Sequence, residues 1–222
     1  MKLVNTEHQI NINFSENVQT VLVIENFNEF QKIIMHLQEQ YINQYDKFYL
    51  SENGRSLSFP KFVDIVMDIF TLQLNSKKIQ NYLYRLASDA ANEFETEKSD
   101  ILSASITFMD KICSEINCME VDYDTIFSYN DFFKLFNFKI RDSDIDLTER
   151  ISTYIKVISE ISDAKILVFI NLKSFISSQQ LSEIYNVAFA YKIHLLLIES
   201  SMSYNMENEQ FYIIDSQLCV IN

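Results

Sequence analysis

Glycine and proline are nearly absent from this 222-residue chain, which holds one of each, Gly54 and Pro60. A loop that cradles phosphate groups needs several glycines, because its backbone amides must approach the anion closely. The sequence therefore contains neither a Walker A loop nor a glycine-rich dinucleotide-binding motif. These absences exclude the commonest enzymes that use nucleotides.

Cysteine is scarce, and long apolar runs are missing. The three cysteines, Cys113, Cys118 and Cys219, are too few and too scattered for a disulfide framework or a zinc site. This usage predicts a reduced, cytoplasmic setting. No apolar stretch approaches the span of a membrane helix, and residues 1–13 lack the apolar run and cleavage site of a signal peptide. We therefore expect no membrane partner.

Positive charge is also in short supply, since 18 Lys and Arg stand against 31 Asp and Glu, a net charge of -13. Taken alone, this balance argues against nucleic acid, because phosphate binding needs clustered cations. The excess acid is concentrated in one segment. Residues 89–149 hold 15 acidic and 5 basic side chains, a net of -10, whereas the rest of the chain has a net of -3. Such a segment is either a solvated face or a cation site.

Both ends of the chain carry the pattern of an α/β fold. Continuous apolar runs at residues 20–25, 165–171 and 193–199 are typical of strands that are buried on both faces of a parallel sheet. A helix that begins near Ser177 or Ser178 separates the last two runs, which gives a β–α–β unit. Residues 211–221 predict a terminal hairpin.

The middle of the chain is predicted to be mainly helical. The helical pattern extends from about residue 61 to 118, followed by a short helix at 125–137 and a strand at 138–141. We therefore expect an α/β head with a mainly parallel sheet, made from residues 1–60 and 138–222. A helical leg domain, residues 61–137, is inserted into it. The head has the layout of a P-loop fold without the Walker motif.

Four segments in this order carry a family resemblance. They are TVLVIENFNEFQKII at 20–34, LQLNS at 72–76, MEVDYD at 119–124, and the run from KILVFIN to LLLIES at 165–200. With the length and element order, they resemble the short form of the Csn2 family, the accessory proteins of type II-A CRISPR spacer acquisition. The resemblance covers essentially the whole chain.

The resemblance implies a protein that is not an enzyme. Family members form a homotetrameric ring that binds the ends of linear double-stranded DNA without sequence preference. Calcium at acidic residues near the junction of head and leg supports the ring. Their partners are the CRISPR adaptation integrase and the effector nuclease.

The acidic run at Glu120, Asp122 and Asp124 is the candidate metal site. In an extended stretch, alternate side chains share a face, so the three carboxylates could converge on a hard cation such as Ca²⁺. The alternative is an exposed acidic turn. The resemblance favours calcium ligands here, and Glu115 lies within reach as a fourth ligand if the preceding helix ends nearby. A second acidic run, at 142–146, is interpreted as a polar loop that caps the next helix.

Five basic side chains are candidates for DNA binding: Lys32, Lys61, Lys77, Lys78 and Arg85. Two of them, Lys77 and Lys78, begin a helix, where the helix dipole disfavours cations, and a phosphate partner would offset that cost. The alternative for each is an ordinary surface cation. A ring would repeat a modest basic patch four times and focus its field on the central opening.

No catalytic arrangement is recognisable. The histidines, His8, His36 and His194, are not paired at ligand spacing, and His194 is expected inside a strand as a satisfied interior residue. No Ser or Cys has a defensible His/Asp partner, so we predict no nucleophile. Two alternatives stay open: a metal-dependent nuclease that uses the acidic run, and an interaction protein or DNA mimic, suggested by the pI of about 4.6.

Overall fold

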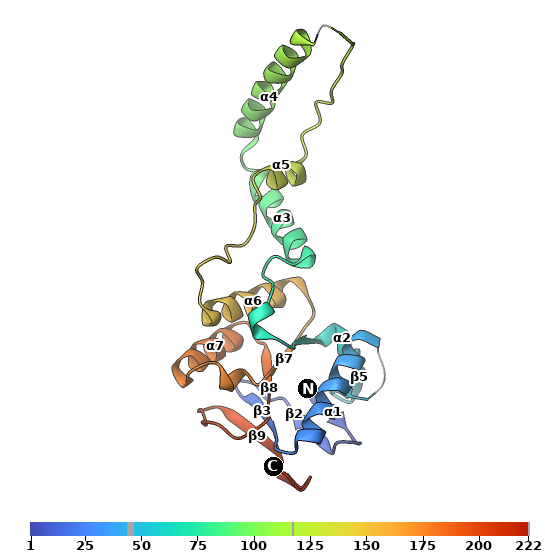
Figure 1. Ribbon diagram of the computed structural model, residues 1–222, viewed down its shortest axis with the longest axis vertical. Helices are drawn as coiled ribbons and strands as arrows, with labels where there is room; N and C mark the ends of the chain where they lie inside the picture. The colour runs from blue at the N-terminus through green and yellow to red at the C-terminus, as the bar shows by residue number, and fades with distance from the viewer. Residues whose placement is uncertain (44–46, 117, 222) are drawn as a thin grey trace. The chain divides into compact units, whose positions relative to one another are not determined.

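The computed structural model describes residues 1–43, 47–116 and 118–221, and the chain divides into two compact units. The first, here the sheet unit, comprises Met1–Leu74 and Asp142–Asn222. The second, here the helical unit, is Asn75–Arg141. The predicted mixed α/β class with a mainly parallel sheet is confirmed (Figure 1). That the helical unit is the leg domain of a ring-forming protein stays a prediction.

A six-stranded sheet forms the centre of the sheet unit in the described residues, in the order β10-β9-β3-β8-β7-β6. All neighbours in it are parallel except the terminal pair of β9 and β10. The strands are β3 Gln19–Ile24, β6 Val63–Val66, β7 Ile166–Ile170, β8 His194–Glu199, β9 Glu209–Ile214 and β10 Val220–Ile221. The predicted central strands and the terminal hairpin are thus confirmed.

The central strands are apolar on both sides because each face of the sheet is covered. Val21 and Val23 of β3 pack on one side with residues of α6 (Leu147–Ile161) and α7 (Ser178–Ala190). Leu22 and Ile24 pack on the other side with residues of α1 (Phe27–Asn43). Each strand therefore contributes alternate side chains to two cores, which explains its unbroken apolar sequence.

A second, antiparallel sheet, β2-β1-β4-β5, contributes to the α1 side of the core. Its strands are β1 Lys2–Asn5, β2 Ile10–Asn13, β4 Tyr49–Glu52 and β5 Arg55–Leu57. The turn between β4 and β5 contains Asn53 and Gly54 at positive φ, 50° and 77°. That backbone is the primed turn that matches hairpin twist, and here the single glycine serves it.

The helices begin where the sequence offers caps. Asn26 accepts a hydrogen bond at Oδ1 from the backbone N of Glu29 at the start of α1. Asp146 caps α6, and Ser177 forms a capping box with Gln180 at the start of α7. A short helix α2 (Phe59–Phe62) and the 3-10 turns η1 (Ile69–Thr71) and η2 (Leu172–Ser174) complete the sheet unit. Caps of this type satisfy otherwise unpaired helix N–H groups.

Two secondary-structure predictions are wrong. The range expected to be helical from residue 61 contains β6, because Val63–Val66 pairs with β7 along the parallel sheet. No strand forms at 138–141 in the described chain. There, the side chain of Asn75 takes the place of a neighbouring strand: it donates to the carbonyl of Ile140 and accepts from its N–H, both at 2.9 Å.

The helical unit contains α3 (Lys77–Ala91), α4 (Glu95–Glu115) and α5 (Tyr129–Leu135). Aromatic rings join α3 to α5, with the Tyr84 and Phe133 centroids 5.5 Å apart. In contrast, no residue of α4 is buried. Across the described residues, no helix combines the length and apolar character needed to cross a membrane.

Candidate functional site

The four predicted calcium ligands are all exposed. Glu115 is the last residue of α4, while Glu120, Asp122 and Asp124 lie in a stretch without regular secondary structure. The adjacent Tyr123 fastens this stretch to α4, because its hydroxyl donates to Asp110 Oδ1 at 2.6 Å. This hydrogen bond is the main reason that the pKa of Tyr123 is raised to about 12.

The acidic run does not form a compact ligand cluster in this structure. Within residues 1–43, 47–116 and 118–221, only Glu7, His8 and His36 place three His, Cys, Asp or Glu ligand atoms within 4.8 Å of one another. Calcium binding by Glu115, Glu120, Asp122 and Asp124 therefore stays a prediction. It would need these exposed carboxylates to gather around the ion.

Two of the basic candidates lie in the sheet unit, and each pairs with a carboxylate. The Lys32 ammonium is 4.0 Å from a carboxylate oxygen of Glu29, and that of Lys61 is 3.2 Å from Asp163. The two lysine side chains are 63% and 57% exposed. The pair of Lys61 with Asp163 is exposed on both sides and contributes little stability, at most about 1 kcal/mol, whereas the Glu29 side chain is only 14% exposed. Both ammonium groups are nevertheless accessible to an anion from solvent.

The other three basic candidates lie on α3 in the helical unit. Lys77 and Lys78 occupy its first turn, and both are exposed, as is Arg85. The guanidinium of Arg85 lies over the Tyr82 ring, 5.2 Å from the centroid. Lys78, Tyr82 and Arg85 follow the i, i+4, i+7 spacing of one helix face, which gives a short cationic stripe backed by an aromatic ring.

Open α/β sheets usually bind ligands at the carboxyl ends of their parallel strands. In this protein, internal hydrogen bonds connect the segments that follow these ends. After β7, Asn171 Oδ1 accepts from the N–H of Ser200 at 2.8 Å. At the end of β8, Glu199 is 2% exposed and accepts from the N–H of Lys173 at 3.1 Å. Burial raises the pKa of Glu199 to about 7. Asn171 and Glu199 at this edge are thus both engaged in internal hydrogen bonds.

A buried ion pair lies close to this edge and was not predicted. The Lys173 ammonium is 2.7 Å from Glu209 Oε1, and both side chains are fully buried. Tyr185 donates its hydroxyl to the same carboxylate, and Lys173 also donates to the carbonyl of Tyr204. The cluster joins η2, α7 and β9 with compensated charges, so it is a structural element.

At the amino ends of the parallel strands, the surface forms a groove of about 580 Å³. Gln19, Lys165 and His194 line it, one from or beside each of β3, β7 and β8. His194 is only half-buried, which corrects the expectation of an interior residue. Burial nevertheless lowers the pKa of this imidazole and favours its neutral form.

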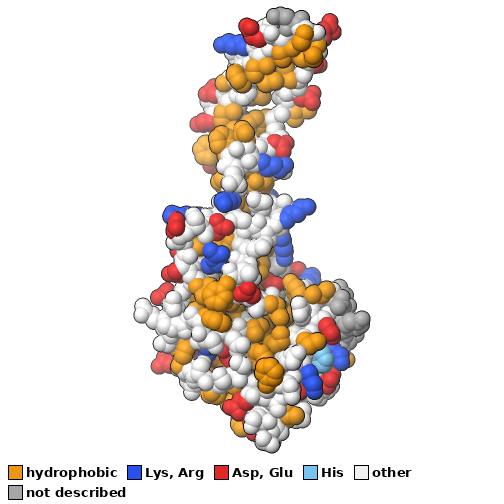
Figure 2. All heavy atoms as spheres, in the orientation of Figure 1, with side chains coloured by type: hydrophobic (Ala, Val, Ile, Leu, Met, Phe, Trp, Pro, Cys, Tyr) orange, Lys and Arg blue, Asp and Glu red, His pale blue; other side chains and the backbone are white. Residues whose placement is uncertain are grey.

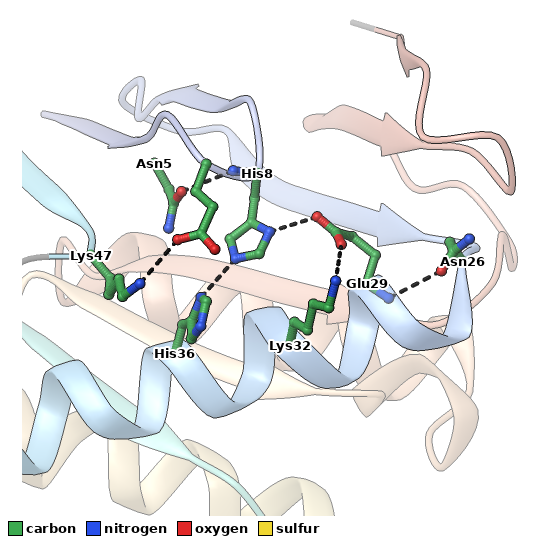
Figure 3. A network of polar contacts seen from close by, with 8 residues as sticks. Asn5, His8, Asn26, Glu29, Lys32, His36 and Lys47 are labelled. Atoms are coloured by element: carbon green, nitrogen blue, oxygen red, sulfur yellow. Dashed lines mark hydrogen bonds and ion pairs between the residues drawn. The ribbon is translucent and has the colours of Figure 1, made fainter.

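The other two histidines form the contact that the sequence did not predict. His8 lies between β1 and β2, His36 lies on α1, and their Nε2 and Nδ1 atoms are 2.7 Å apart (Figure 3). They are 28 positions apart, so no local spacing indicates the pair. One partial signal exists: Glu29 and His36, seven residues apart, share a face of α1.

Comparison with known proteins finds a matching family and similar solved structures. A family model described as "CRISPR-associated protein (Cas_Csn2)" matches residues 40–218. Among solved structures, the chain is similar to a putative ABC transporter ATP-binding protein from Pyrococcus furiosus. The sequence identity is 10%, the match covers 91% of this chain and 88% of that one, and the TM-score is 0.43.

Proposed function

Because the chain belongs to the CRISPR-associated Csn2 family, whose members are accessory proteins of CRISPR systems, we propose that it supports spacer acquisition as a non-catalytic DNA clamp. In this proposal, four copies form a ring that binds the ends of linear double-stranded DNA without sequence specificity. The observation that carries it is the family match itself. That match includes the whole helical unit and β6 to β9 of the parallel sheet.

The exposed cations support DNA binding of the non-specific kind. Lys78 and Arg85 form a stripe on α3, and the exposed side chains of Lys32 and Lys61 are each paired with one carboxylate, of Glu29 and Asp163. Such side chains read phosphates and not base edges, so the affinity falls steeply with salt. The net charge of -13 requires any such surface to be local, repeated by symmetry in the ring.

The surface of α4 supports self-association. Ile101, Phe108 and Ile112 are 39%, 64% and 37% exposed, and their spacing of i, i+7, i+11 places them along one face. Figure 2 shows further apolar side chains, in orange, at the surface of the helical unit. A contiguous apolar face costs free energy in water, and a second copy of the chain would cover it.

Calcium is proposed as the cofactor that orders the acidic run and so supports ring formation. Glu115, Glu120, Asp122 and Asp124 offer oxygen ligands, which Ca²⁺ prefers. Gathering them without a cation would bring like charges together, and the ion would remove that repulsion. The CRISPR adaptation integrase and the effector nuclease are the proposed protein partners.

The test is an electrophoretic mobility shift with linear and covalently closed circular duplexes of the same sequence. In calcium, we expect binding to the linear form only, because DNA can enter a closed protein ring only by threading one of its ends. In chelator, we expect binding to be lost, because calcium is proposed to support the ring. Solution mass, measured by light scattering with and without calcium, reports the ring. Equal binding to closed circles would refute threading.

A second candidate, an interaction protein or DNA mimic, is favoured by the acidic composition and the pI of about 4.6. It predicts no shift of any duplex, with or without calcium. A nuclease that uses the exposed acidic run is the third possibility, and incubation of linear duplex with Mg²⁺ or Mn²⁺ tests it. Cleavage of the duplex that is lost in the Glu120→Gln, Asp124→Asn variant would show a nuclease and would refute the clamp proposal.

A further inference from the structure

The contact between His8 and His36 is built into the sheet unit by two segments. His8 belongs to the hairpin of β1 and β2, and His36 to the third turn of α1. His8 is 4% exposed, and its backbone N–H is held by Asn5 Oδ1 at 3.0 Å. His36 is half-buried, so one side of the pair faces solvent. An ion can therefore reach the pair without unfolding the hairpin.

A carboxylate orients the buried imidazole. Glu29 Oε1 lies 2.6 Å from His8 Nδ1, and the close-up shows the two side chains pointing toward each other (Figure 3). A carboxylate can only accept, so Nδ1 carries the proton and the lone pair of neutral His8 is on Nε2. This lone pair points at His36 Nδ1, which donates to it at 2.7 Å. Carboxylate–histidine pairs of this kind are typical behind the ligands of metal sites.

Glu7 completes a set of three ligands. One of its carboxylate oxygens and one ring nitrogen each of His8 and His36 all lie within 4.8 Å of one another. Two imidazoles and one carboxylate are a donor set that Zn²⁺ binds in four-coordinate sites, with water in the last position. For Zn–N bonds of about 2.0–2.1 Å in a tetrahedron, the two nitrogens would stand about 3.3 Å apart. From their hydrogen-bonded distance of 2.7 Å, the two nitrogens would have to move apart by rotation of the side chains.

We propose that Glu7, His8 and His36 form a binding site for a transition-metal dication of the zinc class, with Glu29 as a positioning residue. When the ion binds, the proton on His36 Nδ1 moves through solvent to Nε2 of the same ring, so that His8 Nε2 and His36 Nδ1 each offer a lone pair to the metal. Nitrogen donors are poorly suited to Ca²⁺ or Mg²⁺, which prefer oxygen ligands, so the site is distinct from the proposed calcium site. Metal binding at this site requires neither DNA binding nor ring formation.

The charges around the site set its strength. Glu7 and Glu29 supply two negative charges, and Lys32 and Lys47 two positive ones. Lys47 lies 3.0 Å from Glu7 Oε2 and therefore competes with the metal for this ligand. Removal of the Lys47 ammonium should therefore tighten metal binding. If Lys47 instead only kept the ligands in place, its removal would weaken metal binding.

The experiment titrates the full chain with Co²⁺ and follows the visible absorption of a tetrahedral cobalt complex, then displaces the ion with Zn²⁺. Cys113, Cys118 and Cys219 are first changed to Ser, because free thiols bind both metals. One equivalent per chain is expected, with equilibrium dialysis of Zn²⁺ as the second readout. Binding of Zn²⁺ should also raise the midpoint of thermal unfolding, because it joins the hairpin to α1 in the folded state only.

Four variants distinguish the site from adventitious binding. His36→Gln, at the half-exposed ligand, abolishes the cobalt spectrum, and Glu29→Gln weakens binding by about 10- to 100-fold, as expected for an outer-shell partner. Lys47→Gln tightens it several-fold, in the direction opposite to the other two. His194→Gln, the matched control at the remaining histidine, leaves binding unchanged.

The contrary results are equally specific. Circular dichroism first establishes that each variant is folded. If the folded His36→Gln protein binds Co²⁺ as tightly as its parent, or if the parent gives no tetrahedral spectrum at neutral pH, the pair is only a hydrogen-bonded structural contact and the metal site is refuted. Either result leaves the DNA-binding experiments untouched, so failure here and failure of the proposed function can be told apart.

Discussion

Glu199 makes the stability of the sheet unit depend on pH. Its side chain is at the end of β8 and is 2% exposed, and burial is the largest cause that raises its pKa from 4.5 to about 7. A backbone hydrogen bond from Lys173 acts in the opposite direction but does not outweigh burial. The folded protein therefore keeps a proton on Glu199 at pH values where the unfolded chain has lost it.

The magnitude follows from linkage. A pKa raised by about 2.5 units corresponds to about 3 kcal/mol, since each unit is worth 1.36 kcal/mol. For an acid whose folded pKa is raised, this stability is fully present below the unfolded value of 4.5 and is lost as the pH rises through about 7. Between about pH 5 and pH 8, the loss amounts to about 2 to 3 kcal/mol.

The measurement is urea unfolding, followed by circular dichroism at a series of pH values, for the parent protein and Glu199→Gln. Glutamine keeps an oxygen for the Lys173 N–H but cannot ionise, so the variant gains stability relative to the parent as the pH rises. Glu183→Gln, at an exposed carboxylate on α7, serves as the matched control and follows the parent. Parallel pH profiles for the parent and Glu199→Gln would show that this carboxyl is not held in its neutral form.

Three further perturbations test other parts of the structure. Lys173→Met leaves the buried Glu209 carboxylate without its cation and should lower the free energy of unfolding, measured in urea, by about 3–5 kcal/mol. The additional change Glu209→Gln should recover much of this loss, because it removes the unpaired charge. Lys78→Glu with Arg85→Glu should weaken duplex binding for every sequence and make the salt dependence shallower by about one unit per lost phosphate contact. Phe108→Asp on α4 should reduce the solution mass with a stability change within about 0.5 kcal/mol, because the side chain is 64% exposed.

Each of these changes has a control and a contrary result. A Lys173→Met protein as stable as the parent would mean that the pair contributes nothing to folding. Lys134→Glu, at an exposed lysine on α5, should leave DNA binding nearly unchanged, so an equal loss there would assign the effect to net charge alone. Leu135→Asp, at a side chain that is 78% exposed, should leave the solution mass unchanged. An unaltered mass for Phe108→Asp would remove α4 from the interface.

The sequence identifies the central strands because burial on both faces leaves an unbroken apolar run, as in β7 and β8. It fails where an element is short. The strands β1 and β2, KLVN and ININ, alternate over only four residues, and β6 is read as helix because VDIV continues the apolar pattern after Pro60. For such segments, pairing with a neighbour decides the structure, and the neighbour is distant in sequence.

The same reason explains which functional features could be predicted. The acidic run and the basic side chains of α3 are local in sequence, so they are visible as patterns, although a pattern does not bring their side chains together. The contacts that the structure does bring together are distant: His8 with His36 across 28 positions, and Lys173 with Glu209 across 36. Each needs two elements to pack before the residues meet.

The two proposed cation sites differ in how much order they require. The imidazoles of His8 and His36 are already in contact through packing of the β1–β2 hairpin on α1, so a zinc-class ion would bind a nearly formed site. The exposed carboxylates of the acidic run lie in irregular backbone, so calcium binding there must include the cost of ordering this segment. A change in the structure or assembly of the chain is therefore expected from calcium, whereas zinc should mainly stabilise the fold that is already present.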